Sequence, residues 1–87
     1  MSIFKAQILT PEGSLYEGDV TGVKMPGTQG SFEVKANHAP IVSTLEKGEV
    51  LIRKNDGDTN YTISGGFVEV ANNKLTLLAE SVVEEEK

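Results

Sequence analysis

The stretch Glu-Val-Leu-Ile-Arg-Lys-Asn-Asp-Gly-Asp-Thr-Asn-Tyr-Thr-Ile, residues 49–63, by itself predicts the class of fold. Its centre, Asn55-Asp56-Gly57-Asp58, is a strong hairpin signal because Asp-Gly tolerates the positive φ of tight turns. Apolar side chains recur at every second position on both sides of the turn, as they do in half-buried strands. The apolar pairs are Val50 with Ile52, and Tyr61 with Ile63. Residues 49–63 are therefore expected to form a β-hairpin.

Outward from this hairpin, the rest of the chain repeats the pattern. Phe4, Ala6 and Ile8 alternate with polar residues, and further strands are expected at 15–17, 20–25, 30–34, 41–45, 67–71 and 74–79. The last is nearly all apolar, which is typical of a strand covered on both faces. No segment has helical periodicity. Eight or nine short strands predict an antiparallel sandwich or barrel.

Glycine, proline and asparagine mark the expected interruptions. Gly18-Asp19 is expected to break a strand, Pro26-Gly27 to turn the chain, and Asn72-Asn73 to form a two-residue turn. Gly22 falls inside the expected strand 20–25, which indicates a bulge or a close approach of another backbone. Residues 1–80 are expected to form one domain, and the acidic tail 81–87 to fray.

Composition excludes several classes of function. The 87 residues include no cysteine, which removes disulfides, thiolate metal sites and cysteine nucleophiles. A net charge of −5 argues against nucleic-acid binding, which needs Lys and Arg against phosphate. No apolar run approaches the length that crosses a bilayer, and the N-terminus has no signal or transit character. We expect a cytoplasmic protein without metal or cofactor.

The single histidine, His38, is the obvious candidate base. Nucleophilic catalysis also needs a hydroxyl and an acid nearby, and neither Ser31, Ser43 nor Ser64 stands in a nucleophile-elbow sequence. His38 alternatively bonds a turn ahead of Pro40 or lies at a protein interface. A protein-interaction module is the most economical interpretation. A small all-β enzyme or ligand carrier using His38, and a free-standing β-sandwich adaptor, stay as alternatives.

The glycine-rich segment Gly27–Gly30 does not have the features of a phosphate loop. It lacks the Gly-Lys-Ser/Thr ending, and no helix is expected after it. We interpret it as a β-turn.

Several segments, in this order, resemble the epsilon subunit of F-type ATP synthases. The resemblance covers nearly the whole chain, and its most specific parts are His38-Ala39-Pro40 and Ser64-Gly65-Gly66-Phe67. The segments that carry it are 8–13, 15–18, 23–34, 37–40, 45–48, 61–70 and 77–80. The resemblance implies a flattened all-β, antiparallel β-sandwich of roughly eight to ten short strands. It also implies a non-catalytic subunit of the central stalk that helps couple proton translocation to ATP synthesis.

The resemblance further implies two partners and a location. The gamma subunit would contact Thr10 and the corner His38, Ala39 and Pro40, through a face that is apolar at its centre with a polar rim. The polar loops of the membrane c-ring would contact the turn Gly27, Thr28, Gln29, Gly30 and Ser31, where Ser31 replaces a residue that is often acidic. The subunit would be peripheral, on the cytoplasmic face of a bacterial inner membrane.

Full-length members of that family continue into a two-helix hairpin that restrains hydrolysis and in some cases binds ATP. The present sequence ends at Lys87 without it. A C-terminal helical domain and ATP binding are therefore not expected here, and whether the hairpin is naturally absent stays open.

Overall fold

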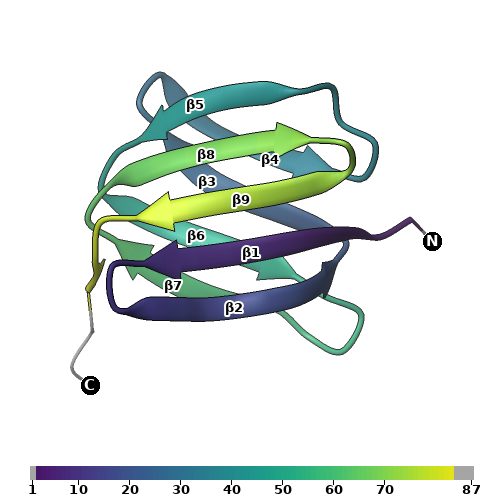
Figure 1. The fold of residues 1–87 in the computed structure, drawn as a ribbon, viewed down its shortest axis with the longest axis horizontal. Helices are drawn as coiled ribbons and strands as arrows, with labels where there is room; N and C mark the ends of the chain where they lie inside the picture. Colours follow the sequence, from purple (N-terminus) through teal and green to yellow (C-terminus); the bar gives the residue numbers. More distant parts are fainter. Residues whose placement is uncertain (1, 84–87) are drawn as a thin grey trace.

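The computed structural model describes residues 2–83, which form ten β-strands joined by turns, with no helix among them (Figure 1). The strands are β1 (Phe4–Thr10), β2 (Gly13–Val20), β3 (Gly22–Gly27), β4 (Gly30–Lys35), β5 (Ile41–Leu45), β6 (Gly48–Arg53), β7 (Thr59–Ile63), β8 (Gly66–Ala71), β9 (Lys74–Ala79) and β10 (Val82–Val83).

The strands stack in two layers, and this arrangement confirms the predicted β-sandwich. The layer in front in Figure 1 has the order β5-β8-β9-β1-β2, and the layer behind has β4-β3-β6-β7-β10. The layers join at one edge, where β3 meets β5 at the pair Gly27–Leu45. At the opposite edge, the Tyr61 hydroxyl of β7 donates to the Leu15 carbonyl of β2 at 3.4 Å. The molecule measures 35 × 28 × 23 Å, a flattened shape.

One pairing departs from the antiparallel rule. β1 runs parallel to β9, with Ala6 opposite Leu75 and Ile8 opposite Leu77, whereas the other strand pairs are antiparallel. The pairing brings the first strand of the chain beside one that follows almost seventy residues later. Local sequence pattern cannot encode such a contact, because alternation specifies a face and not a neighbour.

The core lies between the two layers and is entirely apolar. Its sixteen buried side chains include the alternating sets predicted for the first strand and for the strand at 67–71. Three of the four predicted hairpin residues, Val50, Ile52 and Ile63, are also buried, and Tyr61 is partly buried against the core. They are Phe4, Ala6, Ile8, Val20, Val23, Met25, Val34, Leu45, Val50, Ile52, Ile63, Val68, Val70, Leu75, Leu77 and Ala79. The predicted hairpin is β6–β7, with Gly57 at a φ of 128°.

Two predicted interruptions are wrong. Gly18-Asp19 does not break a strand, because both residues pair with β1 inside β2. The irregularity lies at Leu15, which the register between β1 and β2 skips. Pro26-Gly27 does not turn the chain either. Pro26 is accommodated because its backbone faces away from the β4 ladder, so its missing N–H removes no bond there.

Gly22 was predicted inside a strand that begins at Val20, and this boundary is also wrong. Val20 ends β2, and Gly22 begins β3 after a bend at Thr21. A close approach does occur at Gly22, because a Cβ built there would lie 2.7 Å from the Glu33 Oε2. The approaching group is a side chain and not a backbone.

The prediction that residues 74–79 are covered on both faces is wrong as well. Leu75, Leu77 and Ala79 are buried, but Leu78 points outward and is 46% exposed. The Asn72-Asn73 turn is confirmed, and both residues have the positive φ of a type I′ turn, 55° and 60°.

Two residues of the expected tail lie in a strand. Val82 and Val83 form β10 and pair with β7, and the Ser64 and Ser81 hydroxyl oxygens lie 2.8 Å apart. Residues 84–87, which carry the rest of the predicted tail, lie outside the described residues.

Candidate functional site

The turn predicted to meet the c-ring is a short, exposed tip on the β3–β4 hairpin. Gly27 ends β3, Thr28-Gln29 form the turn, and Gly30 begins β4 at a φ of 125°, a value that favours glycine. The segment 28–31 is exposed, so its side chains are free to meet another molecule. Gly27 itself is buried, and a Cβ there would lie 2.8 Å from the Phe32 ring.

The tip is fastened to β5. The Thr28 N–H donates to the Thr44 carbonyl at 3.2 Å, and the two hydroxyl oxygens lie 3.0 Å apart. The Glu46 N–H also donates to the Pro26 carbonyl at 2.9 Å. These bonds make the tip a continuation of the sandwich, which reduces the conformational entropy it would lose on binding a partner.

The corner His38-Ala39-Pro40 is exposed and leads into β5. The His38 Nδ1 lies 2.7 Å from the Ala39 carbonyl, so this ring nitrogen donates its proton to that oxygen. The bond fixes the ring against its own backbone, as expected for a histidine that orders a turn ahead of a proline.

Asn73, predicted only as a turn residue, holds this corner from the neighbouring hairpin. Its Oδ1 accepts from the Asn37 N–H at 2.7 Å, and its Nδ2 donates to the Ile3 carbonyl at 3.3 Å. Asn37 has a φ of 63°, so the chain makes a left-handed turn directly before His38. The sequence signal was Asn37 itself, because asparagine is one of the few non-glycine residue types that readily adopt positive φ.

Thr10 lies at the opposite end of the front layer from the histidine corner. β5 and β1 run in the same direction, and the corner precedes β5 whereas Thr10 ends β1 (Figure 1). The five residues of β5 span roughly 16 Å. The Thr10 hydroxyl donates to the Gly13 carbonyl and accepts from the Glu12 N–H, which orders the β1–β2 turn. The structure therefore does not bring Thr10 and His38 together.

An apolar surface connects these two ends, and no residue on it was predicted as a site. Phe67 of β8 stands opposite Leu78 of β9, which stands opposite Leu9 of β1. Phe67 and Leu78 are 39% and 46% exposed, and Val42 on β5 is 63% exposed. We call Val42, Phe67, Leu78 and Leu9 the outer apolar patch. Polar side chains of the same strands border it, among them Glu69 beside Val42.

A groove of about 570 Å³ lies between this patch and the β3–β4 tip. Its walls include Phe32, Ile41, Val42 and Phe67 together with the tip residues 27–30. The residues that line it carry no charge. The groove therefore lies between the tip predicted to meet the c-ring and the outer apolar patch.

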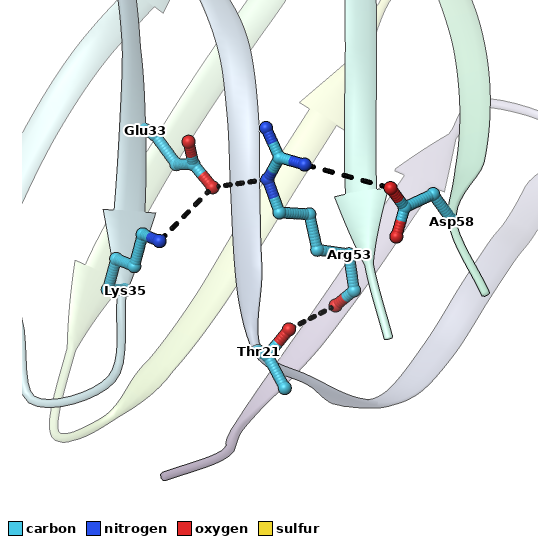
Figure 2. A network of polar contacts seen from close by, with 5 residues as sticks. All are labelled: Thr21, Glu33, Lys35, Arg53 and Asp58. Atoms are coloured by element: carbon cyan, nitrogen blue, oxygen red, sulfur yellow. Dashed lines mark hydrogen bonds and ion pairs between the residues drawn. The ribbon is translucent and has the colours of Figure 1, made fainter. Parts of the chain in front are cut away.

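The back layer carries a charged cluster on its outer face. Figure 2 shows Glu33 of β4 and Arg53 of β6 meeting over β3, with Nε 2.7 Å from Oε2. Lys35 and Asp58 add weaker contacts at 3.8 and 3.7 Å. The hydrogen bond to Glu33, and then its charge, raise the pKa of the Arg53 guanidinium. Arg53 is 39% exposed, so solvent screens this bridge and its contribution to stability is small.

Neither a metal site nor a membrane span is found in the part of the chain that the structure describes. No cluster of three or more His, Asp or Glu residues is suitable for a metal ion there. None of residues 2–83 forms a helix that could cross a membrane.

Residues 3–85 match the family described as ATP synthase, Delta/Epsilon chain, beta-sandwich domain. The chain belongs to this family. It is 44% identical over 79 residues to the ATP synthase epsilon chain of Caulobacter vibrioides, covering 88% of this chain and 90% of that one. The epsilon chain of Chlorobium limicola is 40% identical over 80 residues, 91% of either chain. That of Endomicrobium trichonymphae is 36% identical over 92% of this chain, which spans only 58% of the Endomicrobium protein.

Solved structures agree with this family's fold. A chain in the Euglena gracilis mitochondrial ATP synthase, a structure containing OSCP, F1 and the c-ring, superposes with a TM-score of 0.88 at 20% identity. The match covers 95% of the present chain and 54% of the Euglena chain. A chain in the central stalk and c-ring of the Tetrahymena thermophila mitochondrial enzyme gives 0.78 at 15% identity, covering 92% and 65%. At such low identity these likenesses show the fold alone.

Proposed function

We propose that this epsilon-family chain is a non-catalytic rotor subunit of a bacterial ATP synthase. It binds the gamma subunit through the outer apolar patch and its two flanking ends, and it meets the c-ring through the β3–β4 tip. It thereby helps couple proton translocation to ATP synthesis from a peripheral position on the cytoplasmic face of the inner membrane.

The outer apolar patch is the observation that best supports gamma binding. A well-packed sheet has no structural need for Phe67 and Leu78 on its solvent face, and apolar side chains gathered there are typical of a protein interface. The patch is apolar at its centre and polar at its border, as the resemblance implies for the gamma-binding face. The histidine corner and Thr10 lie at its two ends, which explains how residues so far apart can serve one partner.

The test is the affinity of the chain for the purified gamma subunit of the same enzyme, measured by calorimetry. Phe67→Ser should weaken binding about tenfold or more, because a large side chain is removed from the centre of the interface. Leu51→Ser is the matched control, since Leu51 lies on the outer face of the back layer. It should leave gamma affinity unchanged. Absence of binding by the unaltered chain, or equal losses in both variants, would contradict the proposal.

A further inference from the structure

The outer edge of β5 carries backbone groups that no strand of residues 2–83 occupies. β5 pairs with β8 along its whole length on one side, whereas its other side meets β3 only at Gly27–Leu45. The Thr28 N–H donates to the Thr44 carbonyl there, so the backbone of Thr44 faces away from β8. Since backbone groups alternate between the two sides of a strand, the N–H and C=O of Val42 face the same way. These two groups point to the open edge.

This edge lacks the devices that usually protect an open strand. Natural edge strands carry charged side chains, prolines or bulges that discourage pairing with another chain. The β2 edge of the same layer follows that rule, with a register irregularity at Leu15 and the Lys5–Asp19 ion pair near its end, at 2.7 Å. β5, with the sequence Ile-Val-Ser-Thr-Leu, has neither a charge nor a proline. An unprotected edge of this kind is suited to pairing.

The groove beside β5 indicates which kind of segment would pair with this strand. Val42 and Ile41 of β5 form one wall, and Phe32 and Phe67 contribute aromatic surface. None of the lining residues is charged, although the chain as a whole has a net charge of −5. An uncharged, partly apolar occupant therefore enters without the desolvation cost that a charged one would face.

We propose that β5 accepts an extended, uncharged segment of a partner protein as an added strand, with Val42 as the central pairing residue. Main-chain hydrogen bonds to Val42 would supply affinity, and alternate side chains of the added strand would enter the groove, as in other cases of strand addition. The inference rests on the proposed function, because the gamma subunit is the partner used to test it.

The first test is amide hydrogen exchange on the unaltered chain, alone and saturated with the gamma subunit. Strand addition predicts that the Val42 amide exchanges freely in the isolated chain and slows on the order of a hundredfold in the complex. The Ser43 amide, which faces β8, is the internal control and should be slow in both states. If gamma binds and the Val42 amide stays fast, strand addition is wrong and gamma binding stands. If gamma does not bind, both proposals fall.

The second test compares Val42→Pro with Val42→Ala. Proline retains most of the apolar volume but removes the edge N–H, and an edge strand tolerates it where that N–H faces outward. Alanine retains the N–H and loses two methyl groups. Strand addition predicts that Val42→Pro binds gamma at least about tenfold more weakly than Val42→Ala. Contact through side chains alone predicts the reverse order, which would overturn the inference. Circular dichroism and thermal unfolding check the fold of each variant, and if Val42→Pro misfolds the exchange measurement decides.

Discussion

Two glycines of this sandwich, Gly66 and Gly22, lie close to other atoms, but only at Gly22 can the neighbouring group move aside. A Cβ added at Gly66 would collide with the backbone carbonyl of Leu78 on the paired strand. At Gly22 the added Cβ would lie 2.7 Å from the Glu33 Oε2, which is the far end of a flexible side chain. The same substitution should therefore have very different consequences at these two positions.

We predict that Gly66→Ala destabilises the fold by about 2–3 kcal/mol, because the β8 and β9 backbones must separate to admit the methyl group. Gly22→Ala should change stability by no more than about 1 kcal/mol. It displaces the Glu33 carboxylate from Arg53, a partly exposed bridge, and it also reduces the entropy of the unfolded chain. Urea unfolding of both variants and the unaltered chain measures the difference. Equal losses in the two variants would contradict this account.

At the scale of elements, the two glycines with nearly equal φ lie at opposite ends of the molecule. Gly30, at 125°, shapes the β3–β4 tip, and Gly57, at 128°, shapes the β6–β7 turn. β6 runs antiparallel to β3, so the turn that follows β6 lies at the end away from the tip. Substituting each glycine in turn therefore distinguishes the effect of backbone strain, which both share, from an effect on the proposed binding surface at the tip.

Gly30→Ala and Gly57→Ala should each reduce stability by about 1–2 kcal/mol, because neither φ suits a residue with a Cβ. Only Gly30→Ala should also weaken association with membranes that contain the c-ring, since it distorts the tip proposed to meet the ring loops. Gamma affinity, measured in solution, should be retained in Gly57→Ala, because Gly57 does not line the groove beside β5. Reconstitution with F1-stripped membranes tests the difference, and a loss with Gly57→Ala of the same size would contradict the assignment of the tip.

At the scale of the whole molecule, the pKa values of Lys5, Tyr16 and Arg53 are all raised in the folded protein. Asp19 raises the pKa of Lys5, first by a hydrogen bond and then by its charge, and desolvation raises the pKa of Tyr16. A raised pKa in the folded state means that folding retains protons above the ordinary values of 10.5 and 10.0. These contributions to stability are complete below about pH 10 and are lost as the pH rises through the folded values.

We therefore predict that urea-unfolding midpoints change little between pH 8 and 9 and fall between pH 10 and 11. Tyr16→Phe removes a hydroxyl whose pKa is raised in the folded protein, and Asp19→Asn removes the partner of Lys5. Each should make the alkaline fall shallower. A midpoint that stays constant or rises up to pH 11 in the unaltered chain would contradict the prediction.

The sequence predicted much of the fold because buried faces and turns have local signatures. Alternation identified the inward side chains of the β6–β7 hairpin, and Asn72-Asn73 identified a type I′ turn. The strand boundaries near Gly18 and Pro26 were wrong, because glycine and proline can both occur within strands. Glycine lacks only a side chain and keeps its backbone hydrogen-bonding groups. Proline lacks an N–H, which does no harm where that position faces away from the paired strand. Leu78 was predicted to be buried but is exposed, because an apolar side chain on an outer surface and one in a core give the same sequence pattern.

The sequence by itself therefore determined the all-β class, most of the core faces, a turn between Gly27 and Gly30 and, through the resemblance, the family. Only the tertiary structure decided that β1 lies parallel beside β9, that Thr10 and His38 stand at opposite ends of one face, and that an outer apolar patch joins them. It also revealed the unpaired edge of β5. The physical reason is that each of these features depends on which strands become neighbours, and neighbours are selected by packing of the whole chain rather than by local periodicity.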